Sequence, residues 1–349
     1  MLDWRKLVHL TDEELGRLDI AEVNLACAEG LPGSVDIDHR LCMSTLDRWT
    51  DYVRKFTYGT LPWFYREPDE YKNSVFFYLI LCMVTALQRD LGLRYNPAKI
   101  PEDVPFDTAD TFIHGAVLGD GGTCATIPVV YTAIGRRLGY PLKLVAAKTK
   151  SCGHLLCRWD DPGGERFNIE AVNQGLNTFS NDYYRTGRYA ITPAQEEKCC
   201  LLKSKQPREE LACFLAQRGH RFRELGRHRP AAEAFTWALA LHPDNRMYWN
   251  SCHRSLNEWH ESLGARVPPN FPGVRFRLGR PREFPVTMPE NTENDYHYCQ
   301  VLDNLLNTPD LERRYWGPMR RGLRVPNCPA DVVADFHDFE CTVCLHVLS

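Results

Sequence analysis

A change of hydrophobic pattern after Gly119 constrains the fold more than any other feature of the chain. Apolar residues at spacings of three and four predict a helix over 124–138, which Gly139 and Pro141 bring to an end. Three short segments with the composition of β-strands then follow: 142–147, 154–159 and 166–170. A helix followed by consecutive strands is typical of an α+β fold, and we expect the strands to pair antiparallel.

Helical patterns flank this region on both sides. Residues 41–56 and 73–91 are each expected to form a helix, with Pro62 and Pro68 bracketing a loop between them. The sequence becomes helical again beyond residue 192. We therefore expect three regions: a domain over 1–191 with a helical N-terminal part, a helical region over 192–265, and a C-terminal extension over 266–349 of unclear fold.

The helical region contains one match to the tetratricopeptide repeat pattern. The matching residues are Gly219, Phe222, Gly226, Ala231, Phe235, Ala238 and Pro243. Small residues at these positions let two helices approach closely, and the proline ends the second helix. Residues 249–263 are expected to form a following helix that does not repeat the motif. Because about three repeats are normally needed to bury a continuous core, we expect this pair to pack against the preceding domain or a neighbouring helix.

Charge and composition argue against several classes of protein. The 42 Lys and Arg residues are balanced by 45 Asp and Glu, so the chain lacks the basic excess of a dedicated nucleic-acid-binding protein. The longest apolar run, 75–87, is shorter than the roughly 20 residues needed to cross a bilayer. No signal peptide is recognisable at the N-terminus, so we expect a cytoplasmic protein whose 14 cysteines are reduced thiols.

Cys124 is the candidate nucleophile. It follows Gly121, Gly122 and Thr123 and opens the helix expected over 124–138. Unpaired amides and the macrodipole at a helix N-terminus stabilise a thiolate and lower its pKa from about 8.5 toward neutrality. The same amides are suited to bind the oxyanion that forms when the thiolate attacks an amide carbonyl. Considered alone, however, a free cysteine is more often a buried core residue.

A nucleophilic cysteine also needs a base, and two further residues supply a candidate pair. His154 begins the second expected strand and Glu170 ends the third. Adjacent strands would place them side by side, so that the carboxylate fixes the imidazole tautomer and supports its positive charge. Asn168 alternates onto the same face and is the second candidate for the orienting role. Each residue has a plain structural alternative, but their joint order favours a catalytic triad.

Three stretches resemble the transglutaminase-like superfamily: Gly-Gly-Thr-Cys-Ala-Thr-Ile-Pro-Val-Val-Tyr at 121–131, Gly-Arg-Arg-Leu-Gly-Tyr-Pro-Leu-Lys-Leu-Val at 135–145 and Phe-Asn-Ile-Glu-Ala at 167–171. They are most similar to its bacterial branch with a tetratricopeptide tail, and the resemblance covers roughly residues 20–260. It implies a papain-like core, in which a helix bearing the cysteine packs on an antiparallel sheet. The family's Cys-His-Asp triad would map onto Cys124, His154 and Glu170, with Glu departing from the commonest Asp.

Such a triad implies thiol-based acyl transfer on the amide bonds of a protein or peptide substrate, without a cofactor. Water as the acceptor gives a peptidase, amidase or deamidase, and an amine gives a transglutaminase. We favour hydrolysis, because nothing in the sequence obviously excludes water. The alternative is an inactive scaffold that binds a protein partner through its helical tail. In its favour, Leu118 lies six residues before Cys124, where papain-like enzymes often place a Gln that stabilises the oxyanion.

A second group of cysteines near the end of the chain is a candidate zinc site. Cys341 and Cys344 form a CxxC motif, with His337, His346 and Cys328 nearby. The spacing is loose and the motif has no second copy, so a zinc site is the less favoured interpretation. We expect no resident metal.

Overall fold

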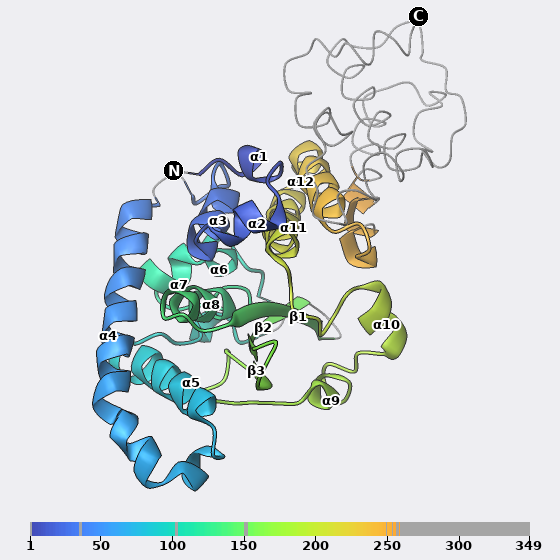
Figure 1. The fold of residues 1–349 in the computed structure, drawn as a ribbon. Helices are drawn as coiled ribbons and strands as arrows, with labels where there is room; N and C mark the ends of the chain where they lie inside the picture. The colour runs from blue at the N-terminus through green and yellow to red at the C-terminus, as the bar shows by residue number, and fades with distance from the viewer. Residues whose placement is uncertain are drawn as a thin grey trace, which may run out of the picture. The chain divides into compact units, whose positions relative to one another are not determined.

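The computed structural model describes residues 2–34, 37–101, 104–149, 153–248, 250–252, 254–255 and 258 (Figure 1). These residues divide into two compact units. The first consists of residues up to Asp3 together with Arg17–Gln206, and the second combines Trp4–Gly16 with the chain from Pro207 onward. No helix among the described residues is both long enough and apolar enough to span a membrane.

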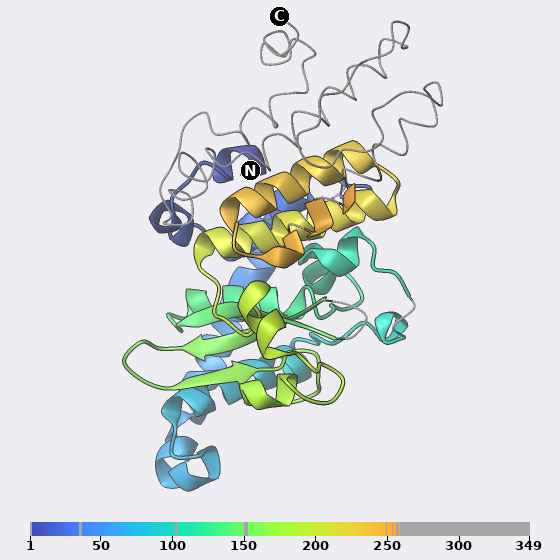
Figure 2. The same cartoon turned by 90° about the vertical axis from the view of Figure 1, so that its right-hand side faces the viewer.

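An antiparallel sheet with the strand order β1-β2-β3 forms the middle of the first unit (Figure 2). Its strands are β1 (Leu142–Lys148), β2 (Gly153–Asp160) and β3 (Arg166–Ile169). The register pairs Ala147 with His154 and Arg158 with Asn168. The α+β class and the antiparallel pairing are thus confirmed. Because side chains alternate across a strand, His154 and Arg158 project from the same face of β2.

Helix α8 (Ile127–Arg137) packs against β1 and β2. Gly135 permits this approach, because a Cβ built there would lie 2.2 Å from the side chain of Leu142. On the sheet side, the hydroxyl of Thr132 contacts the thiol of Cys157 at 3.4 Å. The helix ends at Arg137, and Gly139, which was expected to close it, follows the C-cap Leu138 with a φ of 82° that few other residues adopt. This face of the sheet is therefore covered by a buried helix, which leaves the polar residues of β2 to the opposite face.

The remaining elements of the first unit surround this core. They are α3 (Ile20–Ala28), α4 (His39–Arg66), η1 (Pro68–Tyr71), α5 (Val75–Thr85), η2 (Ala86–Asp90), η3 (Pro97–Lys99), α6 (Thr108–Thr111), α7 (His114–Leu118), α9 (Asn181–Tyr184) and α10 (Pro193–Lys198). The unit continues beyond the boundary expected at residue 191, because the amides of Leu202 and Lys205 bond to carbonyls of β1. That segment covers the outer edge of the sheet.

The prediction of a loop between Pro62 and Pro68 is wrong. Helix α4 continues through Pro62 to Arg66, and η1 begins directly at Pro68. Proline removes one hydrogen bond, to the carbonyl of Tyr58, and this position is exposed, so that water can solvate the carbonyl. Beyond it, Phe64 packs in a buried cluster with Tyr78. The packing of Phe64 holds the last turn of the helix against the local preference of Pro62.

The second unit is built on a helical hairpin of α11 (Pro207–Glu224) and α12 (His228–Leu241). A Cβ at Gly219 would lie 2.9 Å from the ring of Phe235, so the close approach expected of the small residues is present. The hairpin's partner in this unit is the N-terminal segment, α1 (Trp4–Leu7) and α2 (Asp12–Gly16). Their contacts include His9 against Trp237, Arg218 over Trp4, and the amide of Arg208 donating to Asp12.

Candidate functional site

Cys124 lies in the turn that leads directly into α8. Thr123 accepts a hydrogen bond from the amide of Ala125 at its hydroxyl, and its own amide donates to the hydroxyl of Thr126 at 2.8 Å. These two hydrogen bonds fix the turn that precedes α8. Thr123 also donates to the carbonyl of Asp110 at 2.6 Å. Two buried threonines thus hold Cys124 in the turn before α8, which begins at Ile127 and not at Cys124 as expected.

The glycines before Cys124 have specific structural roles. Gly122 forms a parallel bridge with the segment around Tyr95, with hydrogen bonds of 2.8 and 2.9 Å to Asn96 and Arg94. A Cβ at Gly122 would lie 2.6 Å from Ile127, and Gly121 has a φ of 141°. Larger residues are therefore excluded from both positions. The turn that carries Cys124 is anchored on both sides.

The expectation of unpaired amides after Cys124 is not met. The amides of Thr126 and Ile127 donate to the carbonyl of Thr123, and that of Ala125 donates to its hydroxyl. These three donors are consequently engaged within the turn. The sulfur itself is partly accessible, and among the described cysteines only Cys124 and Cys199 are not fully buried. Accessibility therefore distinguishes Cys124 from a core cysteine.

His154 and Glu170 form a buried pair, as their positions in the sequence predicted. Nε2 of His154 lies 3.0 Å from both oxygens of Glu170, and the two residues are only 3% and 2% exposed. Glu170 follows directly after β3, and its amide bonds to the carbonyl of Asn177. Donation from Nε2 to the carboxylate leaves Nδ1 as the ring nitrogen for proton transfer. The strand register has therefore brought together the candidate base and the carboxylate that is expected to orient it.

Two tyrosines that the sequence did not predict at this site complete the surroundings of Glu170. The hydroxyl of Tyr184 donates to Oε2 of Glu170 at 3.0 Å, and that of Tyr189 lies 3.4 Å from the same oxygen and from Nε2 of His154. Burial works to raise the pKa of Glu170, but hydrogen bonds from His154 and Tyr184 outweigh it and leave the pKa below its ordinary value. The cluster of tyrosines at 183, 184 and 189 was the available signal, but nothing in its spacing pointed to a carboxylate.

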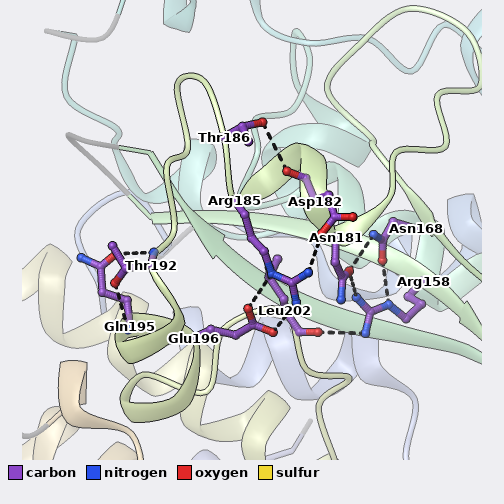
Figure 3. Close-up of polar contacts among 10 residues, drawn as sticks. All are labelled: Arg158, Asn168, Asn181, Asp182, Arg185, Thr186, Thr192, Gln195, Glu196 and Leu202. Carbon is purple, nitrogen blue, oxygen red and sulfur yellow. Dashed lines mark hydrogen bonds and ion pairs between the residues drawn. The ribbon is translucent and has the colours of Figure 1, made fainter.

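Asn168 belongs to a different cluster on the same face of the sheet (Figure 3). Its Oδ1 accepts from Nε of Arg158 at 2.7 Å, and its Nδ2 donates to Asn181 and to the carbonyl of Phe179. Arg158 also donates to Asn181, to the carbonyl of Leu202 and to Ser204. The side-chain amide of Asn168 is therefore committed to this network rather than to the orienting role near His154.

The less favoured zinc cluster of Cys341, Cys344, His337 and His346 lies outside the described residues. Within the described part of the chain, no group of three or more His, Cys, Asp or Glu side chains is arranged to hold a metal ion. Comparison with protein-family models, with curated proteins and with solved structures found no match.

Proposed function

We propose that the protein catalyses thiol-based acyl transfer on amide bonds, with Cys124 as nucleophile, His154 as base and Glu170 as the residue that orients the histidine. The observation that carries this proposal is the buried contact between His154 and Glu170, with Nε2 lying 3.0 Å from both carboxylate oxygens. A carboxylate in that position holds the imidazole in one tautomer and stabilises the imidazolium. The partly accessible thiol of Cys124, in the turn before a helix that packs on β2, supplies the nucleophile.

The proposed reaction begins with transfer of the Cys124 proton to Nδ1 of His154. The thiolate attacks the carbonyl carbon and forms a C–S bond. The C–N bond then breaks as Nδ1–H protonates the departing amine. In the second half, His154 takes a proton from water, whose oxygen attacks the thioester, and the C–S bond breaks to release the acid and the thiolate. An amine in place of that water would give transfer instead of hydrolysis.

The substrate that fits this chemistry is a protein or peptide amide. The transglutaminase-like, papain-like character of the first unit and the tetratricopeptide-like character of the hairpin are part of the same proposal. They rest on the sequence resemblance together with the α+β arrangement and the close packing at Gly219. In this interpretation, the hairpin of α11 and α12 would bind a protein partner.

One observation favours the alternative, an inactive scaffold that uses only the hairpin. The amides of residues 125–127 already donate to Thr123, and the half-exposed Leu118 offers no polar group at the place of an oxyanion donor. Against it stands the burial of a carboxylate with a histidine, an arrangement that is costly to keep unless the pair is well hydrogen-bonded.

The experiment that separates the two functions is alkylation with iodoacetamide at about pH 6.5, where an ordinary thiol reacts slowly. Cys199, the other partly exposed cysteine of the described chain, serves as the internal reference. We expect Cys124 to be modified at least about tenfold faster than Cys199, and His154→Ala to remove that advantage. Equal, slow modification of both thiols, or an advantage that survives in His154→Ala, would establish the scaffold.

A further inference from the structure

Helix α9 connects the two polar clusters on the face of the sheet opposite α8. Its first residue, Asn181, accepts hydrogen bonds from Nη2 of Arg158 at 2.9 Å and from Asn168 at 3.1 Å. Its last residue, Tyr184, is buried and donates to Glu170. Arg158 and Asn168 face each other across β2 and β3, so the start of α9 is fixed to the strands themselves. The length of this short helix then determines where the Tyr184 hydroxyl lies.

The hydroxyl of Tyr184 contacts the Glu170 oxygen that also faces His154. Both Tyr184 and Nε2 of His154 lie 3.0 Å from Oε2, whereas Tyr189 lies 3.4 Å away. A donor on this oxygen opposes rotation of the carboxylate away from the imidazole. Hydrogen bonds to an ionised carboxylate are also about twice as strong as those between neutral groups. Tyr184 is therefore suited both to orient Glu170 and to keep it ionised.

We propose that Tyr184 is a positioning residue, which holds Glu170 ionised and turned toward His154, and that Arg158, Asn168 and Asn181 fix α9 in the position that this requires. The proposal deepens the function above, because it rests on the pair of His154 and Glu170 serving Cys124. It assigns a purpose to the buried arginine network, which takes no part in the reaction itself.

The groups that face Glu170 define what a pH measurement would report. His154 projects from β2 and Tyr184 from α9, while Tyr189 and Arg188 come from the segment that follows α9. Burial and the charge of Glu170 both raise the pKa of Tyr184 and of Tyr189, so these phenols stay protonated at neutral pH. Within this group, Glu170 is consequently the carboxyl whose titration should respond to loss of a phenol donor.

The test compares Tyr184→Phe with Tyr183→Phe. Tyr183 is the matched control, because its ring stacks on Phe179 at 4.0 Å and, among the described residues, its hydroxyl makes no hydrogen bond. The readout is the pH titration of the Glu170 carboxyl carbon by NMR, together with the pH profile of Cys124 alkylation. We expect Tyr184→Phe to move the Glu170 titration upward by about one pH unit. The acid limb of the alkylation profile should move with it, and Tyr183→Phe should change neither.

A second pair of variants examines the network that fixes α9. Asn181→Ala should move the Glu170 titration in the same direction by a smaller amount, although it does not touch Glu170. Asp182→Ala, which removes an ion pair with Arg185 from the same helix, should leave the titration unchanged. Thermal unfolding establishes that each variant is folded before it is titrated.

The outcomes separate this proposal from the proposed function. If Cys124 of the parent protein shows no selective reactivity, the enzymatic function fails, while the carboxyl titration still decides the role of Tyr184. If Cys124 is reactive but Glu170 titrates in Tyr184→Phe as it does in the parent protein, the positioning role of Tyr184 is overturned while the proposed function stands. An equal shift in Tyr183→Phe would also overturn it, because the effect would then follow from loss of any neighbouring phenol.

Discussion

The face of the sheet opposite α8 carries two buried charged clusters that differ in what their charges can do. Arg158 is 1% exposed and is surrounded by neutral acceptors: Asn168, Asn181, Ser204 and the carbonyl of Leu202. Burial lowers the pKa of its guanidinium to about 10, so it remains charged at neutral pH. Glu170, two residues after Asn168, is instead in contact with a histidine and two phenols.

This difference separates a cluster whose charge is fixed from a cluster that contains an imidazole beside a carboxylate. A guanidinium with neutral partners has a fixed charge and no proton to exchange near neutrality, so it can only hold segments in place. An imidazole against a carboxylate can gain and lose a proton while its partners stay where they are. Substitutions in the first cluster should therefore change stability, and substitutions in the second should change reactivity and pH dependence.

The largest effect is expected for Arg158→Met. The substitution keeps the apolar stem but leaves Oδ1 of the buried Asn168 and the carbonyl of the buried Leu202 without the donor that Arg158 supplies, and unsatisfied groups cost about 1–3 kcal/mol each. We expect the free energy of unfolding, measured with urea, to fall by about 3 kcal/mol or more.

Arg166→Met is the matched control on the neighbouring strand. The side chain of Arg166 is 55% exposed and pairs with Asp160, so its loss should cost at most about 1 kcal/mol. Similar losses in the two variants would show that the Arg158 network contributes no more than a surface ion pair.

A second buried histidine, which has no hydrogen-bonded carboxylate within the described chain, sharpens the comparison. His114 lies in α7, and among the described residues neither of its ring nitrogens is hydrogen-bonded. Burial lowers its pKa from 6.5 to about 4; the charge of Asp107 raises the pKa, and that of His39 lowers it. Since the unfolded chain binds this proton first, stability should fall as the pH drops from 6.5 to about 4, by up to about 3 kcal/mol. Urea unfolding at a series of pH values measures this loss of stability. His114→Gln should flatten this part of the curve, and an unchanged slope would assign the loss to other groups.

Glu170→Gln tests the proposed role of the cluster of His154 and Glu170 directly. It should preserve the fold but slow alkylation of Cys124 by about tenfold or more, because the imidazolium loses its counter-charge. The depressed pKa of Glu170 contributes stability above the pKa of the unfolded chain, which is lost as the pH falls through the folded value, and this contribution should disappear in the variant. Unchanged reactivity of Cys124 would remove Glu170 from the triad.

Local patterns predicted the sheet well, because strand composition and the turns between strands are short-range properties. The bounds expected for the strands differ from the observed ones by at most one residue. The continuation of α4 through Pro62 was not predictable in the same way. It depends on Phe64 packing against Tyr78, a contact with a residue that the sequence places in the next helix.

The same distinction applies to the candidate site. The pairing of His154 with Glu170 follows from strand order, and alternation correctly placed Asn168 on the same face as Glu170. Alternation could not show that Arg158, directly opposite on β2, would take the amide of Asn168. The role of Tyr184 depends on the path of the chain after β3, which no periodic pattern describes. Fixed local geometry was predictable, whereas competition among partners was not.

The smallest predicted effect concerns the turn that holds Cys124. Thr123→Ala removes the hydroxyl that caps the amide of Ala125 and donates to Asp110, which should lower the free energy of unfolding by about 1 kcal/mol. It also releases the Ala125 amide, one of the three donors that the turn otherwise occupies. Thr123→Ser is the control, because it keeps the hydroxyl. If Thr123→Ala loses stability and Cys124 reacts more slowly with iodoacetamide, the hydroxyl serves to position the thiol. If stability falls while reactivity holds, the cap is structural, and the reactivity of Cys124 depends on the pair of His154 and Glu170 rather than on its own turn.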